Sequence, residues 1–160
     1  MNYRHPKGVH FSLPFRFNAT RKNKFRVWFY FDSSAVYVHP DSDQFDYNKL
    51  WGYKKKFFYP MRQSFMIGWR YIPNNGRIDV NAYGHAKKGD RQISSPLLSA
   101  KIKKWYYVDV EVFEGHVEMR YKERLEVVEG KFQGLKYLIN PWFGGQKVPP
   151  HSVKMQIIEL

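Results

Sequence analysis

Residues 64–85, SFMIGWRYIPNNGRIDVNAYGH, contain the pattern that decides the fold. On both sides of Pro73-Asn74-Asn75-Gly76, apolar or aromatic side chains occupy every second position. This period of two is typical of a half-buried β-strand, and Asn-Gly supplies the positive φ angles of a tight turn. The stretch therefore predicts an antiparallel β-hairpin whose core-facing side chains are Phe65, Ile67, Trp69, Tyr71, Ile78, Val80 and Ala82.

The same alternation recurs along the rest of the chain. Residues 105–113 and 116–123 form a second expected hairpin around Glu114-Gly115. Many short strands separated by turns are typical of an antiparallel β-sandwich. The chain is therefore expected to be all-β, an antiparallel sandwich or jelly roll with at most one or two short helices. Further strands are expected at residues 9–17, 24–31, 35–39, 97–103, 135–140 and 152–160, and the best candidate for a short helix is residues 44–51.

Length and composition favour one domain covering residues 1–160. The aromatic share of 19% suits half-buried pleated surfaces. No apolar run approaches the roughly 20 residues of a membrane span. The first residues lack the apolar stretch of a secretory signal, so we expect a cytoplasmic protein. The absence of cysteine excludes disulfides and thiolate metal sites.

The net charge of +13 lies entirely before residue 109. A clustered positive charge attracts polyanions, although a lysine-rich surface also simply keeps a protein in solution. Basic residues alternate with aromatic ones in several runs, and this combination neutralises phosphates and stacks bases. We therefore expect a non-enzymatic binding protein for a phosphate-rich anion, either nucleic acid or a nucleotide. The expected ligand-binding residues are Arg70, Arg77, Asn81, Tyr83 and His85 on one sheet face, surrounded by Lys54, Lys55, Lys56, Lys87, Lys88 and Arg91.

Three carboxylates form the alternative, catalytic constellation. Asp109, Glu111 and Glu114 are similar to the jelly-roll glycosidase pattern Glu-x-Asp-x-x-Glu, with the first two carboxylates exchanged. Cross-strand ion pairs with Arg120 or Lys122 are the simpler interpretation. The six histidines lack metal-ligand spacing, so neither a metal nor a cofactor is expected.

Two motifs resemble a poorly characterised family of phage-type concanavalin-like sandwiches. Residues 64–70, SFMIGWR, resemble its Gly-Trp-Arg strand, and residues 137–145, YLINPWFGG, followed by Pro149-Pro150-His151, resemble its C-terminal end. The resemblance covers about residues 62–160. It implies a sandwich fold and a phage-type origin, hence the host-cell cytoplasm, but no activity. Combined with the positive charge, it leads us to expect a protein that sequesters a host signalling nucleotide or coats nucleic acid.

Two other functions stay open alongside nucleotide binding. A virion structural or carbohydrate-binding sandwich would use Trp28, Trp105 and Trp142 as stacking platforms or subunit contacts. Assembly into a homo-oligomer or a virion would accompany that function. The third function is a divergent jelly-roll glycosidase built on the three carboxylates.

Overall fold

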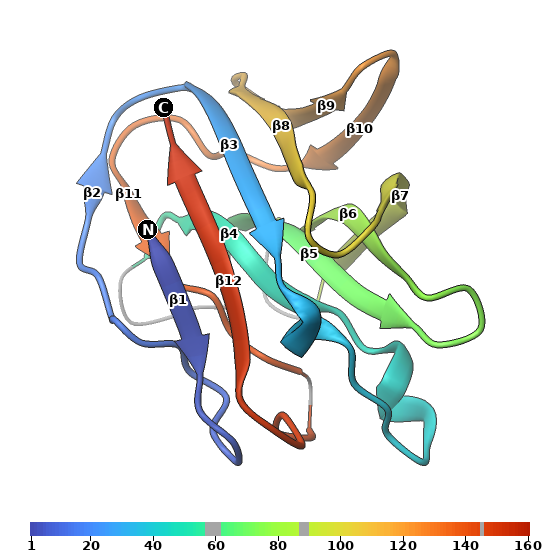
Figure 1. Cartoon of the computed structure of the whole chain (residues 1–160). Coiled ribbons are helices and arrows are strands. Elements are labelled where there is room, and N and C mark those ends of the chain that lie inside the picture. Colours follow the sequence, from blue (N-terminus) through green and yellow to red (C-terminus); the bar gives the residue numbers. More distant parts are fainter. Residues whose placement is uncertain (57–61, 87–89, 145) are drawn as a thin grey trace.

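Two antiparallel sheets lie face to face in the computed structural model, which describes residues 1–56, 62–86, 90–144 and 146–160 (Figure 1). Sheet A runs in the order β1 (Asn2–His5), β12 (Val153–Glu159), β3 (Lys24–Phe31), β8 (Trp105–Val112), β9 (His116–Tyr121) and β10 (Arg124–Glu129). Sheet B runs in the order β2 (Ala19–Thr20), β11 (Lys136–Ile139), β4 (Asn48–Lys54), β5 (Ser64–Ile72), β6 (Arg77–His85) and β7 (Arg91–Ala100). Two 3-10 turns, Ser33–Ala35 and Ser42–Phe45, complete the described elements. The all-β antiparallel sandwich expected from the sequence is confirmed.

The hairpin of β5 and β6 forms as the alternation predicts. The strands pair in register from Ser64 opposite His85 to Ile72 opposite Arg77. Gly76 adopts a φ of 63° in the turn, and its N–H donates to the carbonyl of Ile72 at 3.0 Å. Every residue predicted to face inward from this hairpin lies in the core.

Aromatic rings fill much of the space between the sheets. Phe31 of sheet A meets Trp69 of sheet B with ring centroids 5.0 Å apart, and Tyr37 and Phe143 pack around this pair at 4.9 Å from each other. Burying a side chain of this size contributes roughly 1.5–3 kcal/mol. The ring packing therefore joins the two sheets into one core.

Four expected elements differ from the structure. Residues 9–17 form no strand and contribute only isolated bridges. Residues 35–39 form no strand either, since Ala35 ends the first 3-10 turn and residues 36–39 follow it as loop. The expected helix at residues 44–51 is instead the end of the second 3-10 turn and the start of β4, because pairing with β5 buries this segment. The expected strand at residues 97–103 is the end of β7, and Lys103 turns the chain with a φ of 58°.

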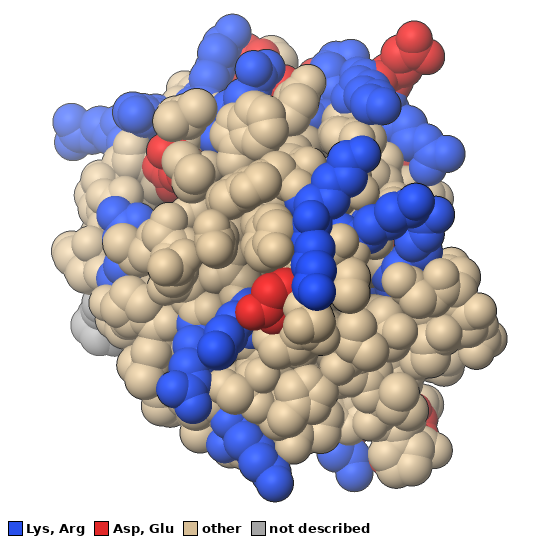
Figure 2. Space-filling view, in the orientation of Figure 1, with Lys and Arg blue, Asp and Glu red and all other residues tan. Residues whose placement is uncertain are grey.

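The charge on the sheet A side is scattered. Figure 2 shows Lys and Arg side chains in separate groups on this face, with large uncharged areas between them. This distribution gives no continuous positive track for a polyanion on the face in view. Among the described residues, none of the helical segments has the length and apolarity needed to cross a bilayer.

Candidate functional site

The outer face of sheet B gathers several of the predicted site residues. Asn81, Tyr83 and His85 alternate with core residues along β6, so all three side chains leave the core on the same side. Strand pairing sets Asn81 opposite Gly68 and Arg70 opposite Asp79 on β5. The alternation in the sequence was therefore sufficient to predict this placement.

A hollow of about 240 Å³ opens on this face. Three cations line it, namely Lys49 of β4, Arg70 of β5 and Arg91 of β7. Arg91 is positioned by the register, because it lies directly opposite His85. Among the described lining residues the hollow has one carboxylate, Asp46, so its charge is positive.

Tyr83 and His85 form the titratable pair of this site. Their ring centroids are 5.4 Å apart in an edge-on arrangement, and both side chains are almost fully buried. Burial lowers the pKa of His85, and the charges of Lys49 and Arg91 act in the same direction. Burial raises the pKa of Tyr83, although Arg91 opposes that shift. At neutral pH the site therefore presents a neutral imidazole beside a protonated phenol.

Asn81 is fully buried on this face, and neither atom of its amide group makes a hydrogen bond within the described residues. The glycine opposite explains how the amide fits. A Cβ at Gly68 would lie 2.4 Å from Oδ1 of Asn81. An unsatisfied buried polar group costs about 1–3 kcal/mol, so a native protein that keeps one has a reason to do so. Asn81 lies two residues before Tyr83 on the same face of β6, and Tyr83 lines the cationic hollow, so hydrogen bonding to a ligand is such a reason.

Lys49 is the residue that the sequence analysis missed. It is buried, and its Nζ donates to the carbonyls of Tyr47 at 3.2 Å and Gly144 at 3.3 Å. Burial lowers its pKa. Its Nζ also lies 5.4 Å from the centroid of the Tyr83 ring. A register shift between Lys49 and Trp51 places the amine here, and nothing in the local sequence indicates that shift.

A second hollow, of about 450 Å³, adjoins the first at Lys49, which lines both. Its walls are mostly apolar and come from β4, β5, β11 and the segment around Trp142. Together the two hollows, which share Lys49, are lined by residues from strands β11 to β7 of sheet B. We call the two together the sheet B groove.

The remaining predicted site residues lie at the edges of this groove or outside it. Lys54 lines the apolar hollow. Lys55 donates to the carbonyl of Gln133, and Lys56 is an exposed residue beyond the end of β4. Arg77 lies at the turn end of β6, opposite Ile72 and away from the Tyr83–His85 pair. The last two, Lys87 and Lys88, fall outside the described residues.

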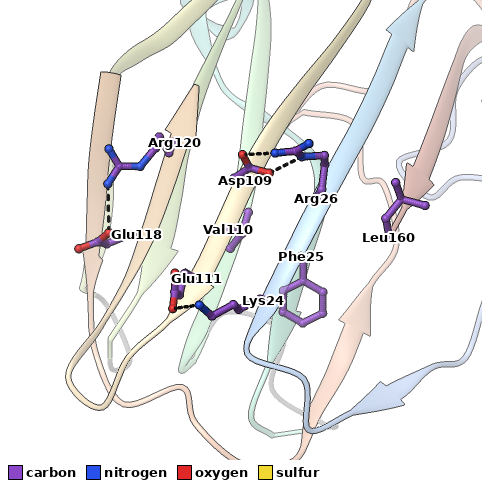
Figure 3. A pocket seen from close by; sticks show the side chains of 9 residues that line it. All are labelled: Lys24, Phe25, Arg26, Asp109, Val110, Glu111, Glu118, Arg120 and Leu160. Carbon is purple, nitrogen blue, oxygen red and sulfur yellow. Dashed lines mark hydrogen bonds and ion pairs between the residues drawn. The ribbon is translucent and has the colours of Figure 1, made fainter. Parts of the chain in front are cut away.

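The predicted carboxylate site lies on sheet A instead. Figure 3 shows Arg26 donating two hydrogen bonds to Asp109, at 2.6 and 2.9 Å, and Lys24 paired with Glu111 at 2.8 Å. The expected pairing with Arg120 is wrong, because Arg120 contacts Glu118 at 3.6 Å. Strand β8 lies between β3 and β9, so Asp109 has a cation on each side, Arg26 and Arg120. It pairs with Arg26, whose guanidinium donates two hydrogen bonds to the carboxylate.

The three candidate tryptophan platforms do not form one surface. Trp28 and Trp105 lie on the outer face of sheet A, where they pack against Tyr107 at 4.9 Å and Tyr30 at 5.5 Å. Trp142 lies in the sheet B groove. Only Trp142 is therefore close to the Tyr83–His85 pair.

Solved structures with the same architecture are polysaccharide-degrading enzymes by their descriptions. An alginate lyase from Klebsiella pneumoniae matches with a TM-score of 0.57 and 11% identity over 86% of this chain, which spans 59% of that enzyme. Alginate lyase vAL-1 from Chlorella virus matches with a TM-score of 0.56 and 10% identity over 99% of this chain and 81% of its own. The catalytic domain of an endo-1,3-beta-glucanase (laminarinase) from Thermotoga petrophila matches with a TM-score of 0.53 and 13% identity over 89% of this chain and 63% of its own.

The comparisons define a class by fold, the jelly-roll sandwich shared by these lyases and glucanases. No protein-family model and no curated protein sequence matches the chain. The likeness corrects two expectations, the phosphate-rich ligand and the absence of enzymatic activity. Both predictions are wrong, because these structures of the same fold are alginate lyases and a glucanase.

Proposed function

We propose that this chain is a carbohydrate-active jelly roll that binds an anionic polysaccharide in the sheet B groove and cleaves it by β-elimination. The observation that carries the proposal is Tyr83, which lines a hollow that Lys49 and Arg91 make positive and whose ring packs edge-on against the buried His85. The fold is compatible with this function, since polysaccharide lyases share it.

The cations suit a carboxylate-bearing sugar, that is, a uronate. β-Elimination removes the proton from the carbon next to the carboxylate, and this carbon becomes acidic only when the carboxylate charge is neutralised. Lys49 and Arg91 line the hollow and would neutralise the carboxylate. The unpaired amide of Asn81, on the same face of β6 as Tyr83, would donate to one of its oxygens. Stabilising developing charge by fixed donors in a partly buried site is a large catalytic effect.

The two rings have the protonation states that elimination needs. The neutral imidazole of His85 takes the C5 proton, and the C5–H electron pair forms the C4–C5 double bond. The bond between C4 and the glycosidic oxygen breaks, and the Tyr83 hydroxyl donates its proton to that oxygen. Burial shifts both pKa values so that at neutral pH each group rests in the protonation state its step needs, the imidazole neutral and the phenol protonated.

Hydrolysis has weaker support in this molecule. A glycosidase needs two carboxyl groups about 5–10 Å apart on either side of the bond. Asp109 and Glu111 are held in ion pairs on sheet A, and among the described residues that line the cationic hollow the carboxylate is Asp46 alone. Elimination is therefore the better supported chemistry.

The test is an assay of the full chain with alginate and hyaluronan, following the ultraviolet absorbance of the unsaturated product. We expect Tyr83→Phe and His85→Ala each to lower the rate by about 10²–10⁴. The control, Glu111→Gln on sheet A, should leave the rate unchanged. Release of reducing ends without ultraviolet absorbance, abolished by Glu111→Gln, would show that the chain is a glycosidase instead.

A further inference from the structure

The apolar hollow of the sheet B groove exposes several large rings at one place. Phe11 is 49% exposed, Phe15 is 70% exposed and Trp142 is 43% exposed. All three line the hollow of about 450 Å³, whose floor includes the buried Met66. Contiguous exposed apolar surface of this kind marks a binding site more often than a passive surface.

The Trp142 ring packs against another ring in this hollow. The indole stacks on His10 with centroids 5.4 Å apart and an angle of 3° between the planes. The Nδ1 of His10 is in turn 2.7 Å from the carbonyl oxygen of Phe143. One face of the indole is therefore covered and supported, which leaves the other face for a flat partner.

The aromatic wall and the cationic hollow are connected through Lys49. The backbone N–H of Lys49 donates to the carbonyl of Trp142 at 2.8 Å, and the N–H of Trp142 donates back to Lys49 at 2.9 Å. The side chain of the same lysine reaches the Tyr83 ring. A sugar chain passing Lys49 would thus place one residue over Tyr83 and a neighbouring residue over Trp142.

The two hollows differ in whether they favour a charged or an uncharged sugar. The cationic hollow has Arg70 and Arg91 besides the shared Lys49, whereas the hollow around Trp142 is lined mostly by rings and aliphatic carbons, with Lys54 and the shared Lys49 as its cations. A carboxylate pressed against apolar walls loses hydration without gaining equivalent hydrogen bonds. An uncharged sugar instead offers a flat face of C–H groups that packs against an indole ring.

We infer that the groove selects a polysaccharide in which uronates alternate with uncharged sugars, the uronate lying at Tyr83 and the uncharged sugar on Trp142. The inference rests on the proposed function and specifies its substrate class. It predicts that a polymer with a carboxylate on every residue is a poorer substrate.

The experiment compares hyaluronan, in which glucuronate alternates with an uncharged amino sugar, with alginate, in which every sugar has a carboxylate. The full chain is assayed for unsaturated product on both. We expect kcat/KM to be at least about tenfold higher on hyaluronan. Trp142→Ala should raise the KM for hyaluronan about tenfold and change the KM for alginate little. Trp142→Phe keeps an aromatic face and should bring the KM for hyaluronan most of the way back to that of the parent chain.

The matched control is Trp105→Ala, which removes another partly exposed tryptophan from the opposite sheet and should leave both KM values unchanged. If Trp142→Ala does not fold, Phe15→Ala tests the same wall, because Phe15 is mostly exposed.

Three results would overturn the inference in distinguishable ways. Equal rates on both polymers, with Trp142→Ala and Phe15→Ala neutral, would refute the alternating substrate and leave elimination intact. No unsaturated product from either polymer would refute the proposed function itself. A dimer in sedimentation that Phe15→Ala dissociates would show that a second copy covers the rings, which also overturns the inference.

Discussion

At the scale of single residues, Asn81 links the stability of the fold to its proposed activity. Its amide is buried without a hydrogen-bond partner among the described residues, in a space that Gly68 leaves open. A protein selected only for stability would place an apolar side chain there. Strain or unsatisfied groups of this kind are typical of functional sites, where stability and activity oppose each other.

Replacing this amide by an isosteric apolar group should therefore change stability and activity in opposite directions. For Asn81→Leu we expect the free energy of unfolding to rise by about 1 kcal/mol, because the unpaired polar atoms are removed from the interior. Elimination activity should fall at the same time. Urea denaturation and the product assay measure the two effects. A variant that loses both stability and activity would contradict this account of Asn81.

At the scale of elements, the pairing of β4 with β5 explains much of the site. A register shift in β4 separates Lys49 from Trp51, so that Lys49 reaches the groove and Trp51 enters the core. Farther along β4, Gly52 approaches β5 closely. A Cβ on Gly52 would lie 2.2 Å from the carbonyl oxygen of Phe65 and 2.7 Å from the Cα of Met66. These are backbone atoms, which cannot move without shifting the strand.

Gly52→Ala should therefore destabilise the sheet by about 2–3 kcal/mol, the range of overpacking in a well-packed interior. Chemical denaturation of the variant measures the change. Gly115→Ala is the matched control, because a Cβ at Gly115 meets no atom within 4 Å. Its stability should stay within about 0.5 kcal/mol of the parent chain. Similar losses in both variants would show that the close approach of β4 to β5 is not the cause.

At the scale of the whole molecule, buried imidazoles make the fold sensitive to acid. His5 of β1 is fully buried, and its Nδ1 lies 3.2 Å from the carbonyl oxygen of His10. Burial lowers the pKa of His5 to about 4 from an ordinary value of 6.5. The unfolded chain therefore binds a proton on this histidine between pH 6.5 and 4 while the folded chain does not.

The contribution of His5 to the free energy of unfolding should accordingly be constant above pH 6.5 and decrease as the pH falls to about 4. The loss is on the order of 3 kcal/mol for a shift of this size. Denaturation curves of the parent chain and of His5→Leu, measured across this pH range, isolate the effect. If the difference between the two proteins does not change with pH, His5 is not the group responsible.

Sequence periodicity was enough to place Tyr83 and His85 on the same face as Arg70, because the alternation of side chains is a local property of a strand. It also predicted the hairpin of β5 and β6 and the closing strand β12. The phage-type resemblance stays a prediction, since the shared sandwich does not distinguish one origin from another.

Local sequence also determined which residues of β8 leave the core, but not which cation each carboxylate meets. Asp109 has Arg26 and Arg120 opposite it on the two neighbouring strands, and in the tertiary structure it forms its ion pair with Arg26. The conformation of residues 44–51 also depends on tertiary contacts. The sequence of this segment suits a short helix, but pairing with β5 makes its second half the start of β4.

The amino-acid sequence by itself therefore determined the sandwich and the outward face of β6, because both follow from a repeat of two residues. Only the tertiary structure decided the groove. Lys49 and Trp142 are far apart in the chain, and they meet through a register shift and an isolated bridge. Contacts of this kind depend on how distant strands pair, and no short stretch of sequence specifies that pairing.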